Sequence, residues 1–402
     1  MALKAVHVSD LPNLDQVPDN VALNFCATRF CNGVNGDSDE VKGSFKFPKF
    51  VVMGHRGTGM NMLQSPDKRM KSIKENTILA FNAATNFPLD FIEFDVQRRT
   101  FCRKQKKTYL LQVTKDECPV IFHDNFILTQ EKGLIVQKRV TDLSLEEFLS
   151  YGPQKEPGKV GKPMFRKLKD GRIFEWNVEK DAPLCTLEEA FEKVDHSIGF
   201  NIELKFDDQI DYEEEQLSHI LKVILQVVFK HAKDRPIFFS SFQPDAALLI
   251  RKLQSTYPVF FLTNGGAQTY TDVRRCSLDE AIKVCLVGGL QGIVSEVKAI
   301  FKNPGVLARI KECKLSLVTY GELNNVPEVV FLQRLMGVEG VIVDLVEEIT
   351  EAVTDLISNV NGEEESLFGE DGKMILKTNL EISKDELSFL FTKLIPELIQ
   401  SN

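Results

Sequence analysis

The stretch Phe91-Ile92-Glu93-Phe94-Asp95-Val96 alternates between apolar and acidic side chains after its first residue. A period of two is typical of a β-strand with two unlike faces, and it places Glu93 and Asp95 on the same face. At about 3.3 Å per residue, these two positions lie about 7 Å apart along the strand. Carboxylates in such apolar sequence are costly to bury unless a partner neutralises them, and a divalent cation is the simplest partner. The alternative is an edge strand whose polar face meets water.

Three other apolar stretches also end in acidic or basic groups. Residues 51–57 end in His-Arg-Gly, and residues 119–124 end in His-Asp. In residues 200–206 the same alternation puts Glu203 and Lys205 on one face. Sites in parallel sheets and barrels are assembled from separate segments at the strand ends. Together the four stretches favour such a site over a solvated edge strand.

Read in order, these motifs resemble those of the glycerophosphodiester phosphodiesterase family. The resemblance covers about residues 50–350, and the longer gap between Gly57 and Glu75, with Met60-Asn61-Met62 inside it, resembles the plant-type eukaryotic branch. The matching motifs are His55-Arg56-Gly57, Glu75-Asn76-Thr77, Glu93-Phe94-Asp95-Val96, His123-Asp124, Pro183-Leu184-Cys185-Thr186-Leu187-Glu188-Glu189, Glu203-Leu204-Lys205 and Ser241-Phe242.

The resemblance implies an α/β fold, a (β/α)8 TIM barrel of the PLC-like phosphodiesterase type with a small insertion between strands two and three. The sequence itself alternates strand and helix patterns after residue 206, which favours parallel crossovers. An open doubly wound sheet is the alternative, but residues 55–59 lack the third glycine of a nucleotide-binding turn. We expect barrel strands at 51–57, 91–97, 200–206, 236–242, 259–263, 292–297, 316–320 and 340–345, and helices at 76–85, 212–233, 245–256 and 278–284.

We divide the 402 residues into an arm, a barrel domain and a tail. Residues 1–48 are expected to form a loosely ordered arm, because prolines and glycines interrupt them. Residues 49–360 form the barrel domain, with the insertion at about 124–199. Residues 361–402 are expected to end in an amphipathic helix that packs on the barrel exterior.

A basic insert at residues 98–112 interrupts the hairpin that joins the strand at 91–97 to His123. One interpretation is a flap that adds affinity for phosphate or a membrane surface. A second is an exposed loop. The third, which we prefer, is a splicing or gene-model artefact, because the flanks rejoin into an ordinary hairpin without it. The insert carries Arg98, Arg99, Arg103, Lys104, Lys106 and Lys107.

Composition excludes several classes of protein. A hydrophobic content of 43% is enough for a full core, and a net charge of −9 argues against nucleic-acid binding. The eight cysteines have no CxxC spacing, which indicates reduced thiols. No apolar run reaches 18 residues, so we expect no stable membrane insertion. We expect a cytoplasmic location, with the plastid as the alternative, because Asp10, Asp15 and Asp19 weaken a transit peptide.

The resemblance assigns Glu93, Asp95 and Glu203 as metal ligands, with Mg²⁺ the first choice and Ca²⁺ the second. Carboxylate oxygens suit either hard cation. The alternative for Glu203 is a salt bridge with Lys205 on the same strand face.

The catalytic residues implied by the resemblance are His55 and His123, with one acting as base and one as acid. We favour His55 as the acid that protonates the leaving alcohol and His123 as the base. The nucleophile is then the glycerol 2-hydroxyl, which gives a cyclic phosphate that water opens, or water itself. Arg56 and Lys205 match cations that bind the phosphate.

Five further residues are candidates for the mouth and pocket. Glu75 and Asn76 match a family motif at the mouth, although Asn76 could be a helix N-cap and Glu75 a surface charge. Ser241, Phe242 and Tyr320 are candidates to line the glycerol pocket, and packing in the core or at the rim is their alternative.

The implied function is metal-dependent hydrolysis of small-molecule glycerophosphodiesters (glycerophosphocholine, -ethanolamine, -inositol or -glycerol) to sn-glycerol 3-phosphate and an alcohol. Such a reaction belongs to lipid and glycerol metabolism and to phosphate recycling. One rival is a lysophospholipase D-type phosphodiesterase, which would need an apolar groove or a membrane-facing patch. Another is an inactive barrel that binds phosphodiesters, because the basic insert lies beside the mouth.

Overall fold

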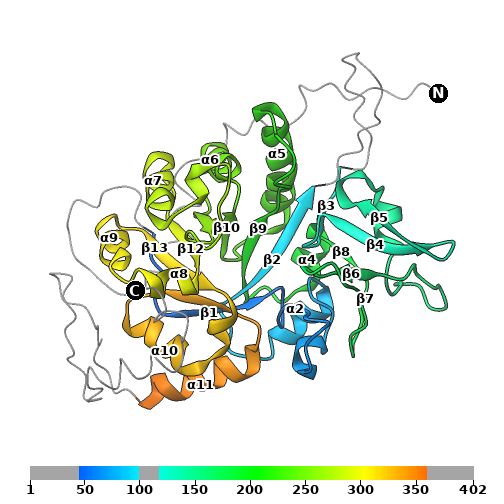
Figure 1. The fold of residues 1–402 in the computed structure, drawn as a ribbon, viewed down its shortest axis with the longest axis horizontal. Helices are drawn as coiled ribbons and strands as arrows, with labels where there is room; N and C mark the ends of the chain where they lie inside the picture. The colour runs from blue at the N-terminus through cyan, green and yellow to red at the C-terminus, as the bar shows by residue number, and fades with distance from the viewer. Residues whose placement is uncertain (1–44, 99–116, 360–402) are drawn as a thin grey trace. The chain divides into compact units, whose positions relative to one another are not determined.

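A closed barrel of eight parallel strands forms the centre of the computed structural model, which describes residues 45–98 and 117–359 (Figure 1). The first strand pairs in parallel with both the second and the last, which closes the barrel and excludes an open sheet. The prediction of a TIM barrel is therefore confirmed. Around the barrel the strands are β1 (Val51–His55), β2 (Phe91–Arg98), β9 (Gly199–Leu204), β10 (Ile237–Ser241), β11 (Val259–Thr263), β12 (Gly292–Glu296), β13 (Ser316–Tyr320) and β14 (Gly340–Val343).

Helices follow the barrel strands and cover their outer faces (Figure 1). Ile92, Phe94 and Val96 point outward and are fully buried in the main core beneath these helices, as the alternation in β2 predicts. Among the described residues, no helix combines the length and hydropathy needed to cross a bilayer. The α-helices are α2 (Ile78–Ala84), α5 (Glu214–His231), α6 (Pro244–Leu253), α7 (Leu278–Gly288), α8 (Val297–Lys302), α9 (Val306–Glu312), α10 (Pro327–Leu335) and α11 (Val346–Asn359), and the 3₁₀ turns are η3 (Lys68–Lys71), η4 (Val140–Asp142), η5 (Val273–Arg275) and η6 (Glu322–Asn325).

The insertion between β2 and β9 carries a sheet that the sequence did not predict (Figure 1). Two short strands, β3 (Pro119–Ile121) and β8 (Cys185–Thr186), extend the barrel sheet beyond β2 in antiparallel pairs. Between them lies a separate four-stranded antiparallel sheet with its own core around Phe148 and Trp176. Its strands are β4 (Phe126–Glu131), β5 (Leu134–Arg139), β6 (Phe165–Lys167) and β7 (Ile173–Glu175), and the insertion also holds α3 (Leu145–Leu149) and α4 (Leu187–Lys193).

Three expectations lie outside the described residues. They are the loosely ordered arm up to residue 44, the basic insert from residue 99 onward, and the C-terminal helix after residue 359. Arg98, the first residue of the expected insert, is the last residue of β2 and pairs with Glu117.

Aromatic rings fill the barrel at the amino-terminal ends of its strands. Phe91, Phe238 and Phe260 come from the starts of β2, β10 and β11, and Phe47 packs on all three with ring centroids 5.8–6.0 Å apart. Phe45 joins the cluster 4.9 Å from Phe47. This aromatic packing, edge-to-face except for the tilted Phe47–Phe260 pair, closes the end opposite the polar groups described below.

Replacing Phe47 by alanine tests this aromatic plug. We expect the Phe47→Ala variant to lose about 3–5 kcal/mol of unfolding free energy, because a large buried side chain is removed. Urea denaturation measures the change, and Val287→Ala, at a side chain that is 86% exposed, is the control. Equal stability of the two variants would show that the plug contributes little.

Candidate active site and metal centre

Three carboxylates from adjacent strands meet at the carboxyl end of the barrel. Glu93 and Asp95 lie on β2, and Glu203 lies on β9 directly opposite Asp95 in the parallel register. One oxygen from each lies within 4.8 Å of the others, and all three residues are buried. The strand alternation in both segments therefore places the three acids in one cluster, as the sequence predicted.

One oxygen of each carboxylate has no hydrogen-bond partner. These atoms are Glu93 Oε1, Asp95 Oδ1 and Glu203 Oε1, and all are shielded from solvent. Lys205 Nζ contacts the cluster as an ion pair, 2.8 Å from Glu203 Oε1 and 3.6 Å from Asp95 Oδ1, so the expected Glu203–Lys205 salt bridge is also present. One ammonium does not balance three buried carboxylates, and a hard divalent cation is the ligand that such a donor set fits.

The pKa values of the two acids on β2 move in opposite directions. Burial, with the charges of Asp95 and Glu203, raises the pKa of Glu93 to about 8. Burial alone would raise the pKa of Asp95 too, but Arg56, His123 and Lys205 hold it below its usual range. One acid of the metal-free cluster is therefore protonated near neutral pH.

His55 ends β1 and is held by a carboxylate that the sequence analysis missed. Its Nδ1 lies 2.7 Å from Asp344 Oδ1, and its Nε2 lies 3.8 Å from Glu93 Oε2. Burial is the largest single influence and would lower the pKa of His55, but the charge and hydrogen bond of Asp344, together with the charge of Glu93, raise the pKa overall. Asp344 directly follows the apolar strand β14, so its place at a strand end was the available signal.

His123, after β3, has the same kind of partner and the opposite pKa shift. Its Nδ1 lies 2.7 Å from Asp124 Oδ1. Burial and the positive charges of Arg56 and Lys205 lower the pKa of His123. In each histidine the neighbouring aspartate contacts Nδ1, so Nε2 is the ring nitrogen left for proton transfer. The electrostatics favour a protonated His55 and a neutral His123.

Arg56 is fixed by three carboxylates and by an unusual backbone conformation. Its φ is +50°, its backbone N–H donates to Glu93 Oε2 at 3.0 Å, and its guanidinium donates to Glu75 Oε1 at 2.7 Å. Its Nε lies 3.2 Å from Asp95 Oδ2. Gly57 continues the turn at φ +101°, where a Cβ would lie 2.8 Å from that of Ala80. The His-Arg-Gly motif is thus a tight turn that aims Arg56 at the acids.

Glu75 and Asn76 also point into the site. Glu75 is 3% exposed, which excludes the surface-charge alternative, and Arg166 and Arg56 lower its pKa to about 2 although burial opposes them. Asn76, at φ +57°, donates to Asp95 Oδ2 at 2.8 Å. The helix N-cap is instead Thr77, which accepts from the backbone N–H of Ala80, so the N-cap alternative for Asn76 is wrong.

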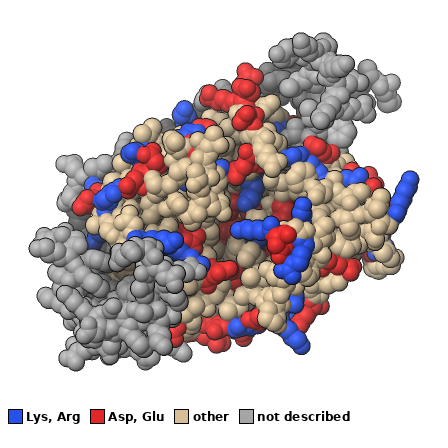
Figure 2. Space-filling view, viewed as in Figure 1, with Lys and Arg blue, Asp and Glu red and all other residues tan. Residues whose placement is uncertain are grey.

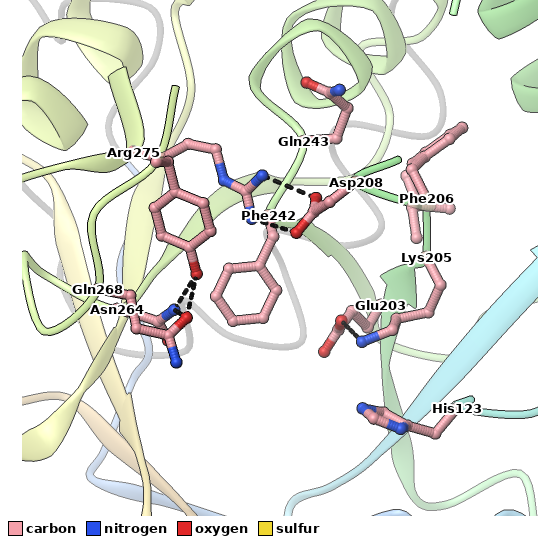
Figure 3. A pocket seen from close by; sticks show the side chains of 12 residues that line it. His123, Glu203, Lys205, Phe206, Asp208, Phe242, Gln243, Asn264, Gln268 and Arg275 are labelled. Atoms are coloured by element: carbon pink, nitrogen blue, oxygen red, sulfur yellow. Dashed lines mark hydrogen bonds and ion pairs between the residues drawn. The ribbon is translucent and has the colours of Figure 1, made fainter. Parts of the chain in front are cut away.

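A pocket of about 340 Å³ opens beside the acids (Figure 3). Figure 2 shows acidic and basic side chains meeting in a hollow near the middle of the drawn face. Phe242 projects into the pocket between the Glu203–Lys205 pair and the Asp208–Arg275 pair. The residues that line the pocket are His123, Glu203, Leu204, Lys205, Phe206, Asp208, Phe242, Gln243, Asn264, Gln268, Tyr270 and Arg275.

Ser241 and Tyr320 are not among the lining residues of this pocket. The hydroxyl of Ser241 is fully buried and donates to the carbonyl of Leu204 at 2.8 Å. Tyr320 packs edge-on against Phe242, with ring centroids 6.1 Å apart, and its hydroxyl bonds Asn264. Both residues therefore support the wall around Phe242.

Adding Mg²⁺ tests the carboxylate cluster without an activity assay. We expect the ion to stabilise the folded chain by about 2.7 kcal/mol at about 100 times its Kd, measured as a rise in Tm. Because the pKa of Glu93 is raised to about 8, binding releases a proton, so the Tm rise should grow as pH increases toward 8.

The matched variants for this measurement are Glu93→Gln and Glu188→Gln. Glu188 belongs to a second, partly exposed acidic group with Glu192 and His231, and it already pairs with His231 at 2.9 Å. We expect Glu93→Gln to abolish the Tm rise and Glu188→Gln to keep it. The reverse pattern would place the ion on the surface.

Comparison with known proteins gives concordant results. The glycerophosphoryl diester phosphodiesterase family matches residues 55–99 and 111–348. The chain is 56% identical to the chloroplastic glycerophosphodiester phosphodiesterase GDPD1 of Arabidopsis thaliana over 401 residues, which cover all of both chains. It is 58% identical to Arabidopsis GDPD3 over 371 residues, which cover 90% of this chain and 94% of that relative.

A solved structure with a similar fold is an Oleispira antarctica phosphodiesterase in complex with the product sn-glycerol-3-phosphate. Its TM-score is 0.50 at 17% identity, covering 76% of this chain and 97% of that one. The interruption of the family match at residues 100–110 falls inside the expected basic insert. On the extent of the family match and the identity to full-length relatives, the chain belongs to the glycerophosphoryl diester phosphodiesterase family.

Proposed function

We propose that this phosphodiesterase hydrolyses glycerophosphodiesters to sn-glycerol 3-phosphate and an alcohol at the carboxyl end of its barrel. Glycerophosphocholine, -ethanolamine, -inositol and -glycerol are the expected substrates. The observation that carries the proposal is the group of three buried carboxylates, each with an oxygen that makes no hydrogen bond, flanked by two histidines with opposite pKa shifts. Enzymatic activity as a glycerophosphodiester phosphodiesterase agrees with the names of its full-length relatives.

Glu93, Asp95 and Glu203 are the residues that would hold a divalent cation. A bound cation would neutralise negative charge on the phosphoryl group. Mg²⁺ is the first choice and Ca²⁺ the second, because carboxylate oxygens suit both. Arg56 and Lys205 lie against the same carboxylates and would bind the remaining phosphate oxygens.

The two histidines divide the proton transfers. His123, whose pKa is lowered, accepts the proton from the attacking hydroxyl. His55, whose pKa is raised, donates a proton to the alcohol oxygen as its bond to phosphorus breaks. The attacking group is the glycerol 2-hydroxyl, which yields a cyclic phosphate that water then opens, or else water itself attacks.

The pocket supports a small polar substrate over a lysophospholipid. Its wall away from the acids carries Gln243, Gln268 and the Asp208–Arg275 pair, and apolar side chains line only part of it. A retained acyl chain would need a longer apolar groove. The complete set of acids and histidines at one barrel end supports a working enzyme over an inactive phosphodiester-binding barrel.

For the compartment, the comparison supports the plastid alternative over the cytoplasmic expectation. The relative that aligns with the whole chain at 56% identity is named as chloroplastic. We therefore propose a plastid location.

The activity test measures glycerol 3-phosphate release from glycerophosphocholine by the purified chain, with Mg²⁺, Ca²⁺ or excess EDTA. We expect metal-dependent release that Glu93→Ala abolishes, while Glu215→Ala, at an exposed position in α5, retains it. His123→Ala should lower kcat by about 10²–10⁴-fold, because it removes the general base.

Two further assays distinguish the proposed function from a lysophospholipase D activity and from an inactive barrel. Faster cleavage of lysophosphatidylcholine than of glycerophosphocholine would contradict the proposed substrate class. If no diester is cleaved with any metal, the same assay on a chain without residues 98–112 shows whether the basic insert blocks activity. If the shortened chain also cleaves no diester, the inactive phosphodiester-binding barrel would be favoured over the enzyme.

The pH dependence tests the role of His55. Because Asp344 raises the pKa of His55, and His55 must be protonated to act as the acid, activity should fall as pH rises through that pKa. Asp344→Asn should lower the pKa and shift the alkaline limb of the kcat/KM profile to lower pH. Asp195→Asn, at an exposed site, is the control, and an unshifted limb in Asp344→Asn would contradict the assignment.

A further inference from the structure

One arginine of the insertion contacts two carboxylates of the site. Arg166, in β6, donates from Nη1 and Nη2 to the two oxygens of Glu75 at 3.0 and 2.6 Å. Its Nε donates to Asp124 Oδ2 at 3.0 Å. A single guanidinium therefore joins two acids that lie far apart in sequence, and it does so from the sheet that the barrel does not need for closure.

Each of these carboxylates contacts one residue of the proposed active site. Glu75 Oε1 accepts from Arg56 Nη1 at 2.7 Å, and Asp124 Oδ1 lies 2.7 Å from His123 Nδ1. Arg166 is thus two contacts away from both a proposed phosphate-binding cation and the proposed base. Carboxylates that carry such contacts must themselves be held in place, as ligand-orienting groups are in other sites.

The surroundings of Arg166 leave its guanidinium little freedom. The group stacks on Trp176 with its carbon 3.7 Å from the ring centroid, and the residue is 8% exposed. Trp176 is itself fixed, because its Nε1 donates to Asn61 Oδ1 at 3.0 Å. A planar fork on an aromatic face suits two carboxylates at once, whereas a lysine ammonium is a point charge that fits this geometry less well.

We infer that Arg166 is a positioning residue that sets the orientation of His123 through Asp124 and of Arg56 through Glu75. The insertion sheet is then a working part of the active site. This inference rests on the proposed function, because it assigns Arg166 a role in the same reaction.

The deciding variant is Arg166→Lys, which keeps the buried positive charge and loses the fork. We expect its Tm to stay near that of the wild type and its kcat for glycerophosphocholine to fall by about 100-fold, the size of effect that a misplaced catalytic group produces. KM should change much less than kcat. Arg172→Lys is the matched control, since Arg172 lies in the same insertion, pairs with Asp170 and is exposed.

A double-mutant cycle shows whether Arg166 acts on the active site through Asp124 or through Glu75. If Arg166 acts through Asp124, adding Arg166→Lys to Asp124→Asn should lower kcat by much less than it does in the wild type. A wild-type kcat in Arg166→Lys would overturn the inference. So would a full loss that persists in both the Asp124→Asn and the Glu75→Gln backgrounds, because Arg166 would then act through neither carboxylate.

The same measurements distinguish a failure of the proposed function from a failure of the positioning role of Arg166. An inactive wild-type chain would contradict that function, whereas an active wild type with an unaffected Arg166→Lys variant would contradict only the positioning role. Should Arg166→Lys unfold at the assay temperature, the Glu75→Gln and Asp124→Asn variants decide the matter. Unchanged kcat in both of them overturns the inference.

Discussion

The structure depends on keeping three carboxylates buried within 4.8 Å of one another. Each buried ion costs several kcal/mol unless opposite charge compensates it. Arg56 and Lys205, which directly follow β1 and β9, supply part of that compensation, and the turn at His55-Arg56-Gly57 is shaped so that a backbone N–H also reaches Glu93. Each of the three acids still has one oxygen that makes no hydrogen bond, and Lys205 balances only part of the negative charge there, so a divalent cation completes the compensation.

Most of the barrel and the centre of the site could be predicted from the sequence. Alternation in residues 91–96 and 200–206 fixes which side chains face the barrel interior, and the parallel register then brings Asp95 opposite Glu203. The wall beyond the strand end was harder to predict. Ser241 is the last residue of β10 and is fully buried, whereas Phe242, the next residue, lines the pocket.

The contacts of the supporting residues could not be predicted, because these contacts join distant segments. His55 and Asp344 are 289 positions apart, and Glu75 and Arg166 are 91 apart. Neither Asp344 nor Arg166 lies in a motif with a characteristic spacing. The sheet that carries Arg166 was missed for a related reason, since its short strands alternate with Lys-, Gly- and Pro-rich loops that have weak patterning.

The most direct test of the central claim is diffraction from crystals grown with Mn²⁺, recorded at the manganese absorption edge. The account predicts an anomalous peak among Glu93, Asp95 and Glu203 that disappears in crystals of Glu93→Gln. A peak confined to Glu188, Glu192 and His231, or no peak among the buried acids at saturating Mn²⁺, would contradict it.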